Sequence, residues 1–275
     1  MIADHKQLRP KCQHYPLTVE SGRGFDLNRS LFERLASVLP ISTLEAQHRM
    51  HPVISEIPRI VTYPNLKDAP SVLKHPSPMG LASRVVMIDH DVEEDREFDS
   101  VETMESVSRT NLHEVDLVVG IVRYLFQQGY KPSDLVVLTP YLGQMVKIQN
   151  SLAQDYDVFV DERDLNEARD QLGNVEIVKR GDKGEPKSLV RVATIDNYQG
   201  EEAKIVVISL VRSNDRGEIG FLKEPERVNV MLSRARECEI IVGNRRTLEN
   251  ARGSFDPLKG GPLWKKIFGY LESLE

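Results

Sequence analysis

The stretch VATIDNYQGEEAKIVVISLV, residues 192–211, decides the fold of this chain. It begins as a β-branched run, breaks at Gln199-Gly200 into a turn followed by two carboxylates, and resumes as an apolar run. We interpret this pattern as a strand, a polar loop and a second strand. A second stretch, RVNVMLSRAR at residues 227–236, has helical spacing and leads into another strand pattern. Arginines at a helix-to-strand junction are suited to phosphate, because the guanidinium group donates in a planar fork.

The rest of the chain alternates strand and helix patterns in the same way. The clearest helix runs from Leu112 to Gln128, with apolar residues at three- and four-residue spacing, and Gly129 ends it. A last helix pattern, Pro262 to Leu271, has one apolar face that should pack on the sheet. Such alternation predicts an α/β fold with a mainly parallel sheet flanked by helices. The strand patterns are residues 84–88, 135–138, 189–195, 205–211 and 239–242.

Composition narrows the class of protein. A chain of 275 residues can bury a full core, as one large domain or one and a part. Its net charge of -6 argues against a protein that holds nucleic acid mainly through a bulk positive field. Cys12 and Cys238 have no metal-ligand spacing, so we interpret them as reduced thiols. Without an apolar stretch of ~20 residues or a signal-peptide pattern, we expect a soluble protein of the cytoplasm or nucleus.

Four motifs carry a family resemblance. With ADHKQLRP at residues 3–10 and QHRMHP at residues 47–52, the two stretches quoted above resemble the later motifs of superfamily 1 helicases. The branch they resemble is that of the RNA helicases related to the nonsense-mediated decay and senataxin enzymes. Two further matches resemble the zinc-finger NFX-type helicases of RNA silencing. These are YPNL at 63–66 through PSV at 70–72, and VRSN at 211–214 through GFL at 220–222.

The resemblance implies a domain organisation. A motor of this class needs a Gly-x-x-x-x-Gly-Lys-Ser/Thr loop and an acidic strand end that holds magnesium, and this sequence contains neither pattern. In the family, the motif at residues 3–10 lies after both elements, although Ala3 stands here where glycine is usual. We therefore expect residues 1–50 to be a remnant of the first RecA-like domain with the crossover, and residues 51–275 the second RecA-like, P-loop NTPase-type domain. The polar residues 155–187 are interpreted as a flexible insertion.

The resemblance also implies a nucleotide site for ATP. Arg234 corresponds to the family's arginine finger, which projects onto the γ-phosphate, and Arg49 to a second phosphate-sensing arginine at the hinge. Gln7 corresponds to the glutamine that reads the γ-phosphate and couples it to domain closure. Glu202 matches the acidic residue that hydrogen-bonds the nucleotide ribose, after the turn at Gly200. The Mg²⁺ ligands are expected in the missing first domain.

Contacts to a nucleic-acid strand are implied by two further segments. TPYLGQ at residues 139–144 resembles a family motif in which Thr139 would donate a hydroxyl to a backbone phosphate and Gly143 would allow close approach. Thr194, at the end of its strand, is a second candidate. Such contacts position a strand without reading its bases, which suits a translocating motor. The full candidate set is Thr139, Pro140, Tyr141, Gly143, Thr194 and Gln199.

Several patterns keep a structural alternative beside the functional one. Asn111, three residues before Glu114, matches a family pattern and also a helix capping box, and we favour the cap. Tyr198 would either stack on a base or pack between strands. His48 and His51 are four residues apart but lack a third ligand, so no metal site is predicted. The acidic segment 91–99 is interpreted as a solvated loop.

These observations favour an ATP-dependent helicase that translocates 5′ to 3′ on single-stranded RNA, with DNA as the alternative substrate. This piece alone should be inactive, because the main nucleotide site lies in the missing first RecA-like domain. Silencing or decay factors are the implied partners. A non-catalytic RNA- or partner-binding module derived from a helicase is the alternative, followed by a DNA helicase-nuclease of the same superfamily. Backbone contacts alone do not distinguish RNA from DNA.

Overall fold

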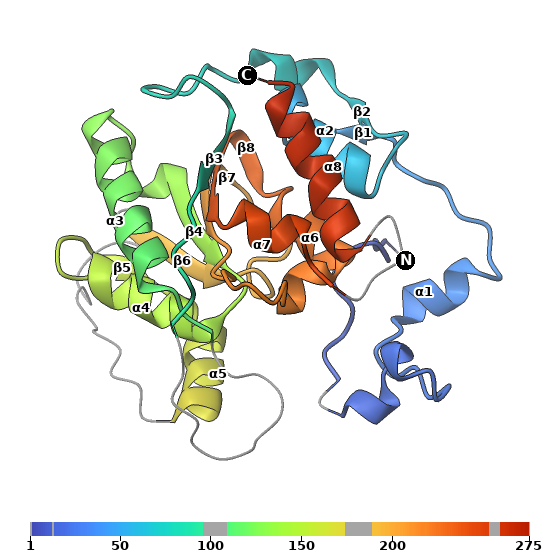
Figure 1. Cartoon of the computed structure of the whole chain (residues 1–275). Coiled ribbons are helices and arrows are strands. Elements are labelled where there is room, and N and C mark those ends of the chain that lie inside the picture. The colour runs from blue at the N-terminus through green and yellow to red at the C-terminus, as the bar shows by residue number, and fades with distance from the viewer. Residues whose placement is uncertain (1, 13, 96–108, 174–188, 253–258, 275) are drawn as a thin grey trace.

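A parallel sheet of six strands forms the centre of the molecule (Figure 1). The computed structural model describes residues 2–12, 14–95, 109–173, 189–252 and 259–274. The strand order is β3-β8-β7-β4-β6-β5, and every neighbouring pair is parallel. The predicted α/β class and parallel sheet are confirmed. The strands are β3 (Val85–Asp89), β4 (Leu135–Thr139), β5 (Val158–Phe159), β6 (Val190–Thr194), β7 (Ala203–Ser209) and β8 (Ala235–Gly243).

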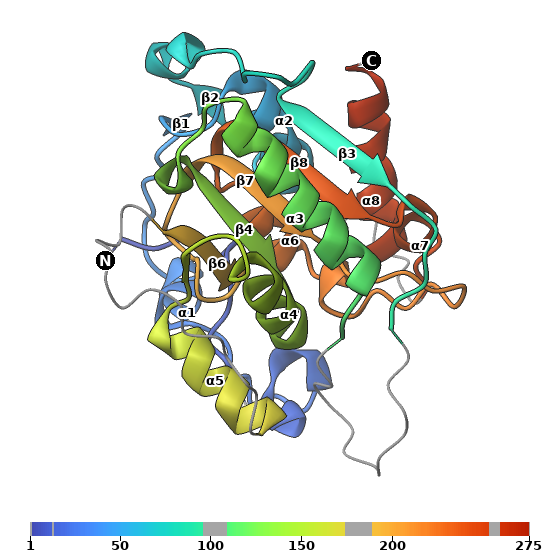
Figure 2. The ribbon, with the colours of Figure 1, turned by 90° about the vertical axis from the view of Figure 1, so that its left-hand side faces the viewer.

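Helices cover both faces of this sheet (Figures 1 and 2). One face carries α3 (Leu112–Gln127), α4 (Leu142–Leu152) and α5 (Glu162–Leu172). The other carries α2 (Pro52–Val61), α6 (Pro225–Met231), α7 (Arg245–Glu249) and α8 (Gly260–Glu272). Short 3-10 helices span Tyr15–Leu17, Val19–Ser21, Pro70–Lys74, Pro132–Asp134 and Gly220–Lys223.

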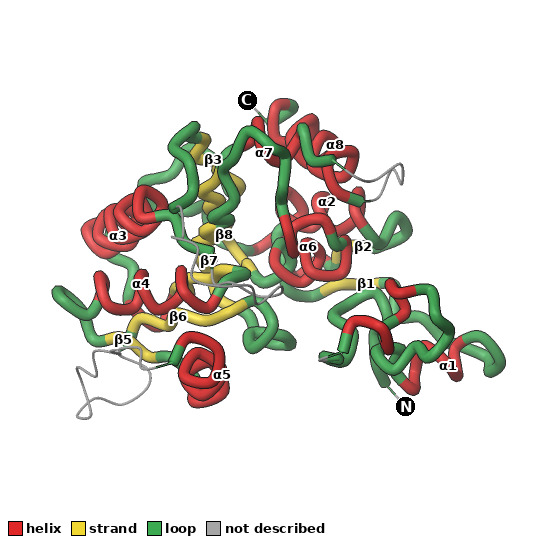
Figure 3. The backbone as a smooth tube through the Cα atoms, turned by 60° about the horizontal axis from the view of Figure 1, so that its bottom comes forward, coloured by secondary structure: helices red, strands yellow, loops and turns green. Residues whose placement is uncertain are grey.

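The N-terminal segment lies beside this layered body (Figure 3). It contains α1 (Leu31–Ala36) and ends at β1 (Ala46–Gln47), which pairs with β2 (Lys67–Asp68) as a separate two-stranded sheet. Many of its apolar side chains are exposed, in contrast to the body. The exposed ones include Phe25, Leu27, Leu31, Val38, Leu39, Ile41 and Leu44.

Two apolar cores lie above and below the sheet, because a strand buried on both faces packs alternate side chains in opposite directions. The last helix packs as predicted. Trp264 and Phe268 of α8 are buried, and the indole Nε1 of Trp264 donates to the carbonyl oxygen of Leu222 at 2.9 Å. That bond satisfies the polar atom of the indole, so its burial costs little.

Part of the segment 155–187, expected to be a flexible insertion, is regular. It contains β5 and α5, and Asp161 caps the helix by accepting from the backbone nitrogen of Arg163 at 2.9 Å. The helical signal in the sequence is weak, because only Leu165, Ala168 and Leu172 are apolar in this helix. Residues 174–187 lie outside the described residues.

The acidic segment 91–99 is only partly a solvated loop where the structure describes it, because residues 91–93 are exposed whereas Glu94 and Asp95 are half-buried. Glu94 accepts from Nε of Arg212 at 2.7 Å, and Asp95 accepts from Nζ of Lys147 at 3.0 Å. Their partners are distant in sequence, which is why the local acidic composition misled the prediction. Glu97 and Asp99 lie outside the described residues.

Candidate functional site

Arg49 and Arg234 come together at the edge of the sheet where β7 and β8 begin. Arg49 follows β1, and its Nη1 donates to the carbonyl oxygen of Ser233 at 3.0 Å. Its Nε donates to Oε2 of Glu202, the residue just before β7, at 2.6 Å. Arg234 is the residue just before β8. Three residues predicted from separate motifs thus form one group, the arginine cluster, defined as Arg49, Glu202 and Arg234.

The backbone before Arg49 is fixed by a single amide side chain. Oε1 of Gln47 accepts from the backbone nitrogens of Arg49 at 2.9 Å and of Met50 at 2.8 Å. Nε2 of Gln47 donates to Asp68 of β2 at 2.7 Å, so the short β1–β2 pair anchors this turn. The QHRM motif therefore has a structural reason for its glutamine as well as its arginine.

Arg234 points into the protein and is only 1% exposed. Its Nε donates to the carbonyl oxygen of Val230 at 2.7 Å, Nη1 to that of Glu201 at 3.3 Å, and Nη2 to Oγ of Ser233 at 2.8 Å. All three acceptors are neutral. Burial, and after it the charge of Arg49, lowers the pKa of Arg234 to about 10, so the group stays protonated at neutral pH. Two cations held close together favour an anion at this place.

A left-handed turn sets the position of Glu202. Gly200 has φ 88, a conformation that glycine adopts without the steric cost of a Cβ atom. Arg191 clamps the turn from β6, where its Nη2 donates to Oε1 of Glu201 at 2.7 Å. Glu201 is therefore held by an ion pair with Arg191.

Gln7 reaches the same region from the N-terminal segment. Nε2 of Gln199, in the loop between β6 and β7, donates to Oε1 of Gln7 at 3.4 Å. Next to it, Nδ2 of Asn229 in α6 donates to the carbonyl oxygen of Lys6 at 3.1 Å and to the Tyr63 hydroxyl at 2.9 Å. Sequence analysis missed Asn229, although it stands inside the RVNVMLSRAR stretch.

Thr139 and Thr194 end neighbouring strands at the opposite edge of the sheet. They are register partners in the β4–β6 pair, and both are buried. The Oγ1 of Thr139 has no hydrogen-bond partner among the described residues. Oγ1 of Thr194 donates to Oδ1 of Asp164 in α5 at 2.6 Å. The two residues are neighbours in the sheet, as strand-end phosphate contacts would be, but Asp164 of α5 occupies the Thr194 hydroxyl.

The other residues predicted to contact a nucleic-acid strand lie at two different edges of the sheet. Tyr141 is buried and stacks on Phe221 with ring centroids 5.5 Å apart, and burial raises the pKa of its hydroxyl. Pro140 is half-buried, and Gly143 is buried in the first turn of α4. Gln199 is exposed beside Gln7 and so lies near the arginine cluster instead. The six residues therefore do not form one open surface.

Three open alternatives are decided by packing. Oδ1 of Asn111 accepts from the backbone nitrogen of Glu114 at 3.2 Å, which confirms the helix cap. Tyr198 is 3% exposed, with the guanidinium of Arg191 4.8 Å from its ring centroid, so it packs between strands. His51 caps α2, because its side chain accepts from the backbone nitrogen of Val53.

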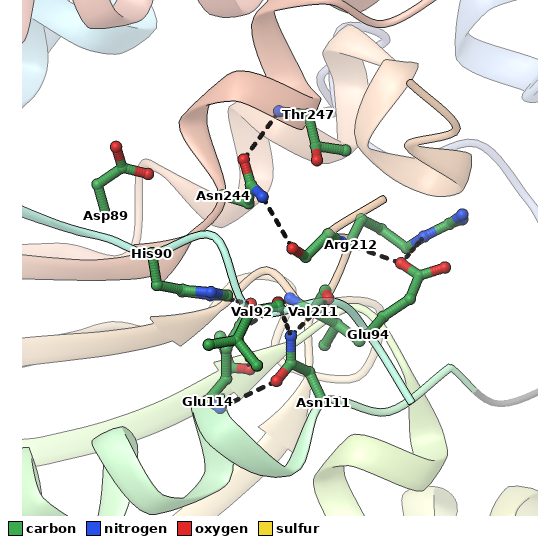
Figure 4. Close-up of polar contacts among 12 residues, drawn as sticks. Asp89, His90, Val92, Glu94, Asn111, Glu114, Val211, Arg212, Asn244 and Thr247 are labelled. Carbon is green, nitrogen blue, oxygen red and sulfur yellow. Dashed lines mark hydrogen bonds and ion pairs between the residues drawn. The ribbon is translucent and has the colours of Figure 1, made fainter. Parts of the chain in front are cut away.

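Only half of the capping box is present, because the side chain of Glu114 is used elsewhere (Figure 4). Its Oε2 accepts from Oγ of Ser209 at 2.6 Å and from the backbone nitrogen of Val211 at 2.9 Å. Its Oε1 lies 3.0 Å from Nε2 of His90. These contacts join α3 to the carboxyl ends of β3 and β7. Sequence analysis missed this buried polar network because its members are far apart in the chain.

The network holds a strained residue. Val211 has φ 70, which is costly for a β-branched residue, and its carbonyl oxygen accepts from Nδ2 of Asn111 at 3.4 Å. The turn directs Arg212 toward Glu94 (Figure 4). The Asn111 and Glu114 side chains thus determine the conformation of the VRSN segment. The sequence shows both the VRSN motif and the Asn111–Glu114 pair, but it does not show that they are in contact.

Two further properties concern the described part of the chain. It contains no group of three or more His, Cys, Asp or Glu side chains that could hold a metal ion. None of its helices has both the length and the apolar character needed to cross a membrane.

Comparisons with known proteins identify the family of this chain. The AAA domain family model matches residues 27–246. NFX1-type zinc finger-containing protein 1 of Mus musculus is 34% identical over 268 residues, which cover 97% of this chain and 11% of that protein. The helicase required for RNAi-mediated heterochromatin assembly 1 of Schizosaccharomyces pombe is 34% identical over 267 residues, which cover 96% of this chain and 22% of that protein. The regulator of nonsense transcripts 1 homolog of Neurospora crassa is 32% identical over 258 residues, which cover 90% of this chain and 20% of that protein.

The chain belongs to the AAA domain family, and its relatives place it among the superfamily 1 helicases. Within that superfamily it is related to the NFX1-type zinc-finger proteins and to the regulators of nonsense transcripts, as its motifs indicated. It spans only 11% to 22% of the length of the three relatives described. The C-terminal domain of a possible DNA helicase from Lactobacillus plantarum WCFS1 has a TM-score of 0.39 and 15% identity, over 77% of this chain and 91% of that one.

Proposed function

We propose that this chain is the second RecA-like half of an ATP-driven motor that moves along single-stranded nucleic acid, with RNA as its substrate. The observation that carries the proposal is the contact of Arg49 with the backbone of Ser233, next to Arg234. It brings two arginines from separate motifs to one place, with Glu202 beside them. An isolated surface arginine would contribute little, but two converging on one site favour a phosphate ligand.

In this proposal the arginine cluster acts on the γ-phosphate across the cleft from another RecA-like domain. Arg234 leaves its three neutral acceptors and stabilises the charge that develops during phosphoryl transfer. Arg49 exchanges Glu202 for the phosphate, which frees the Glu202 carboxylate for the ribose. Gln7, linked to the β6–β7 loop through Gln199, couples nucleotide binding to closure.

The strand would be held through its sugar-phosphate backbone at the carboxyl ends of β4 and β6. Thr139 and Thr194 supply hydroxyls, and the first turn of α4 at Gly143 supplies backbone. These contacts position the strand without reading sequence. Silencing or decay factors remain the proposed partners, since relatives carry such names.

We place the domain boundary near residue 50, with residues 1–50 a remnant of the first RecA-like domain together with the crossover and residues 51–275 forming the second domain. The separation of α1 from the layered body supports this division (Figure 3). Magnesium and the phosphate-cradling loop would come from the preceding domain, so the chain by itself should not hydrolyse ATP. When bound, the metal would neutralise phosphate charge during transfer.

One observation favours a second candidate, a non-catalytic module that binds nucleic acid or a protein partner. Arg234 is buried and fully engaged inside the domain, as a purely structural arginine would be. In that case the guanidinium would hold the junction of α6 and β8 together and would never meet a phosphate.

ATPase assays distinguish the two candidates. The rate is measured with and without single-stranded RNA, for this chain and for a version extended upstream to include a nucleotide-binding loop. The motor predicts turnover only in the extended protein. There Arg234→Ala should lower it by about 10³ to 10⁵, the contribution of an arginine finger. Arg246→Ala, a 79% exposed arginine of α7, is the matched control and should keep the rate.

An extended protein that stays inactive while this chain binds RNA would support the binding module. Turnover that survives Arg234→Ala would remove the arginine-finger assignment even if the motor assignment stood.

A further inference from the structure

One carboxylate collects three donors at the carboxyl end of β6. Oδ1 of Asp164 accepts from Oγ1 of Thr194 and from Nδ2 of Asn197, each at 2.6 Å. Its Oδ2 accepts from the backbone nitrogen of Thr194 at 3.1 Å. Asp164 comes from α5, and its side chain is fully buried against these groups. A buried carboxylate that receives a hydroxyl, an amide and a backbone N–H occupies an anion site.

A fourth donor lies beside this site without a partner. Thr139 is the register partner of Thr194, and paired residues of neighbouring parallel strands direct their side chains to the same face. Its Oγ1 is buried and has no hydrogen-bond partner among the described residues. Leaving a buried hydroxyl unpaired costs free energy, so the Asp164 carboxylate satisfies this site incompletely.

A phosphodiester fits these donors better than the carboxylate does. It has two non-bridging oxygens that share one negative charge, plus two ester oxygens, so one group can accept from both threonine hydroxyls as well as from Asn197 and the backbone. It is also ionised at every physiological pH. Burial, the largest effect, raises the pKa of Asp164 despite the three hydrogen bonds that lower it. The carboxylate charge is therefore held here less favourably than in water.

We propose that α5 is an autoinhibitory element, in which Asp164 occupies the position of a strand phosphate and blocks the Thr139–Thr194 site until nucleic acid displaces it. This inference rests on the proposed function, since it concerns the same strand-binding residues. To the proposed strand-binding site it adds Asp164 as the anion that competes with the phosphate and Asn197 as a further donor to the phosphate. It also requires α5 to move when nucleic acid binds.

Ion pairs connect α5 to the N-terminal segment and, through it, to the β6–β7 loop. Nζ of Lys11 lies 2.8 Å from Oε1 of Glu167 in α5 and 3.7 Å from Oδ2 of Asp196 in the β6–β7 loop. Both ion pairs are partly exposed, so each contributes little to stability. These ion pairs therefore add little to the buried contacts of Asp164 and Ala168 that hold α5 on the sheet.

Binding of a fluorescent single-stranded oligouridylate to this 275-residue chain provides the test. Asp164→Asn removes the competing charge and should tighten binding about tenfold, equivalent to about 1.4 kcal/mol. Asp170→Asn removes one exposed charge from the same helix and controls for the general reduction in negative field. Adding Thr194→Val to Asp164→Asn should abolish the gain.

Hydrogen exchange on the unmodified chain gives a second readout that does not depend on a variant folding well. Amides of residues 162–172 should exchange faster when the oligouridylate is bound, because α5 leaves its site. Equal affinities for the Asp164→Asn and Asp170→Asn proteins, or α5 amides that keep their protection in the complex, would overturn the inference and leave the proposed function intact. Absence of any binding by all proteins would instead count against the proposed function itself.

Discussion

Glu239 is an ionisable residue in an apolar part of the sheet. It lies within β8, it is fully buried, and both carboxylate oxygens lack a hydrogen-bond partner in the described part of the chain. Burial raises the pKa of Glu239 to about 8. The side chain is therefore neutral in the folded protein at pH 7, whereas in the unfolded chain it ionises near pH 4.3.

This difference makes folding pH-dependent. Between about pH 4.3 and 8 the unfolded chain has lost the proton that the folded protein retains, so the stability of the fold decreases as pH rises through this window. Below the window both states are protonated, and the full stability is present. The sign is opposite to that of a carboxylate held in an ion pair, such as Asp68. Burial raises the pKa of Asp68, but hydrogen bonds from Ser55, Gln47 and Arg59 together lower it below its usual value.

We predict that Glu239→Gln raises the melting temperature by roughly 10–20 °C at pH 8 and by only a few degrees at pH 5, because the raised pKa corresponds to about 5 kcal/mol at pH 8. One pKa unit corresponds to about 1.4 kcal/mol, and 1 kcal/mol shifts Tm by about 2–4 °C in a chain of this size. Calorimetry across this pH range measures the effect. Asp116→Asn, an exposed acid in α3, should show no comparable gain. A variant that stays as pH-sensitive as the parent would assign the pH dependence to other groups.

At the scale of elements, α3 does more than cover the sheet. Its first turn carries Asn111, which caps the helix, and Glu114, which binds groups at the ends of two strands. The helix position fixes Val211 in a left-handed conformation, and this sets the direction of the segment after β7. One helix end thus organises the carboxyl edge of the sheet.

Glu114→Ala should lower the free energy of unfolding by about 3 kcal/mol. The substitution leaves the Ser209 hydroxyl and the Val211 nitrogen buried without an acceptor, and each unsatisfied group costs about 1–3 kcal/mol. Urea denaturation measures the loss. Asp116→Ala, two positions further along the same helix and exposed, should cost less than about 0.5 kcal/mol. Equal losses for both variants would mean that the network contributes nothing beyond helix propensity.

At the scale of the whole molecule, the N-terminal segment and the layered body differ in how they are stabilised. The body has two large apolar cores, whereas the helix α1 has no buried residue. The segment reaches the body through polar contacts such as Gln7 with Gln199 and Lys11 with Glu167. Such contacts contribute little stability individually.

Limited proteolysis should therefore remove the segment first. We expect trypsin to cut at the exposed Arg23 and Arg34 before any site in the body, and the remaining protein should keep a single cooperative unfolding transition. Mass spectrometry of the early fragments identifies the cuts, and calorimetry of the purified product measures the transition. Early cleavage within β6 to β8, or loss of the transition after removal of the segment, would show that the segment is part of the cooperative unit.

Much of the fold was accessible from the sequence, because apolar periodicity reports burial directly. The strand patterns match β3, β4 and β6 to β8, and the helix predicted from Leu112 is α3. Local polarity was the less reliable guide. The polar residues of α5 predict a flexible insertion, and the acidic composition around Glu94 predicts a solvated loop. In the structure both α5 and Glu94 are ordered by partners elsewhere in the chain.

The sequence by itself determined the family and the parallel sheet, and it proposed Gln7, Arg49, Glu202 and Arg234 as candidate site residues. Motifs and periodicity are local properties that can be recognised along the chain without knowledge of its fold. Only the tertiary structure decided what those side chains contact. It folded Arg234 inward, placed Glu202 on Arg49, and put Asp164 over Thr194. Each of these is a contact between residues that are distant along the chain, and which charges and donors meet depends on how the helices pack on the sheet.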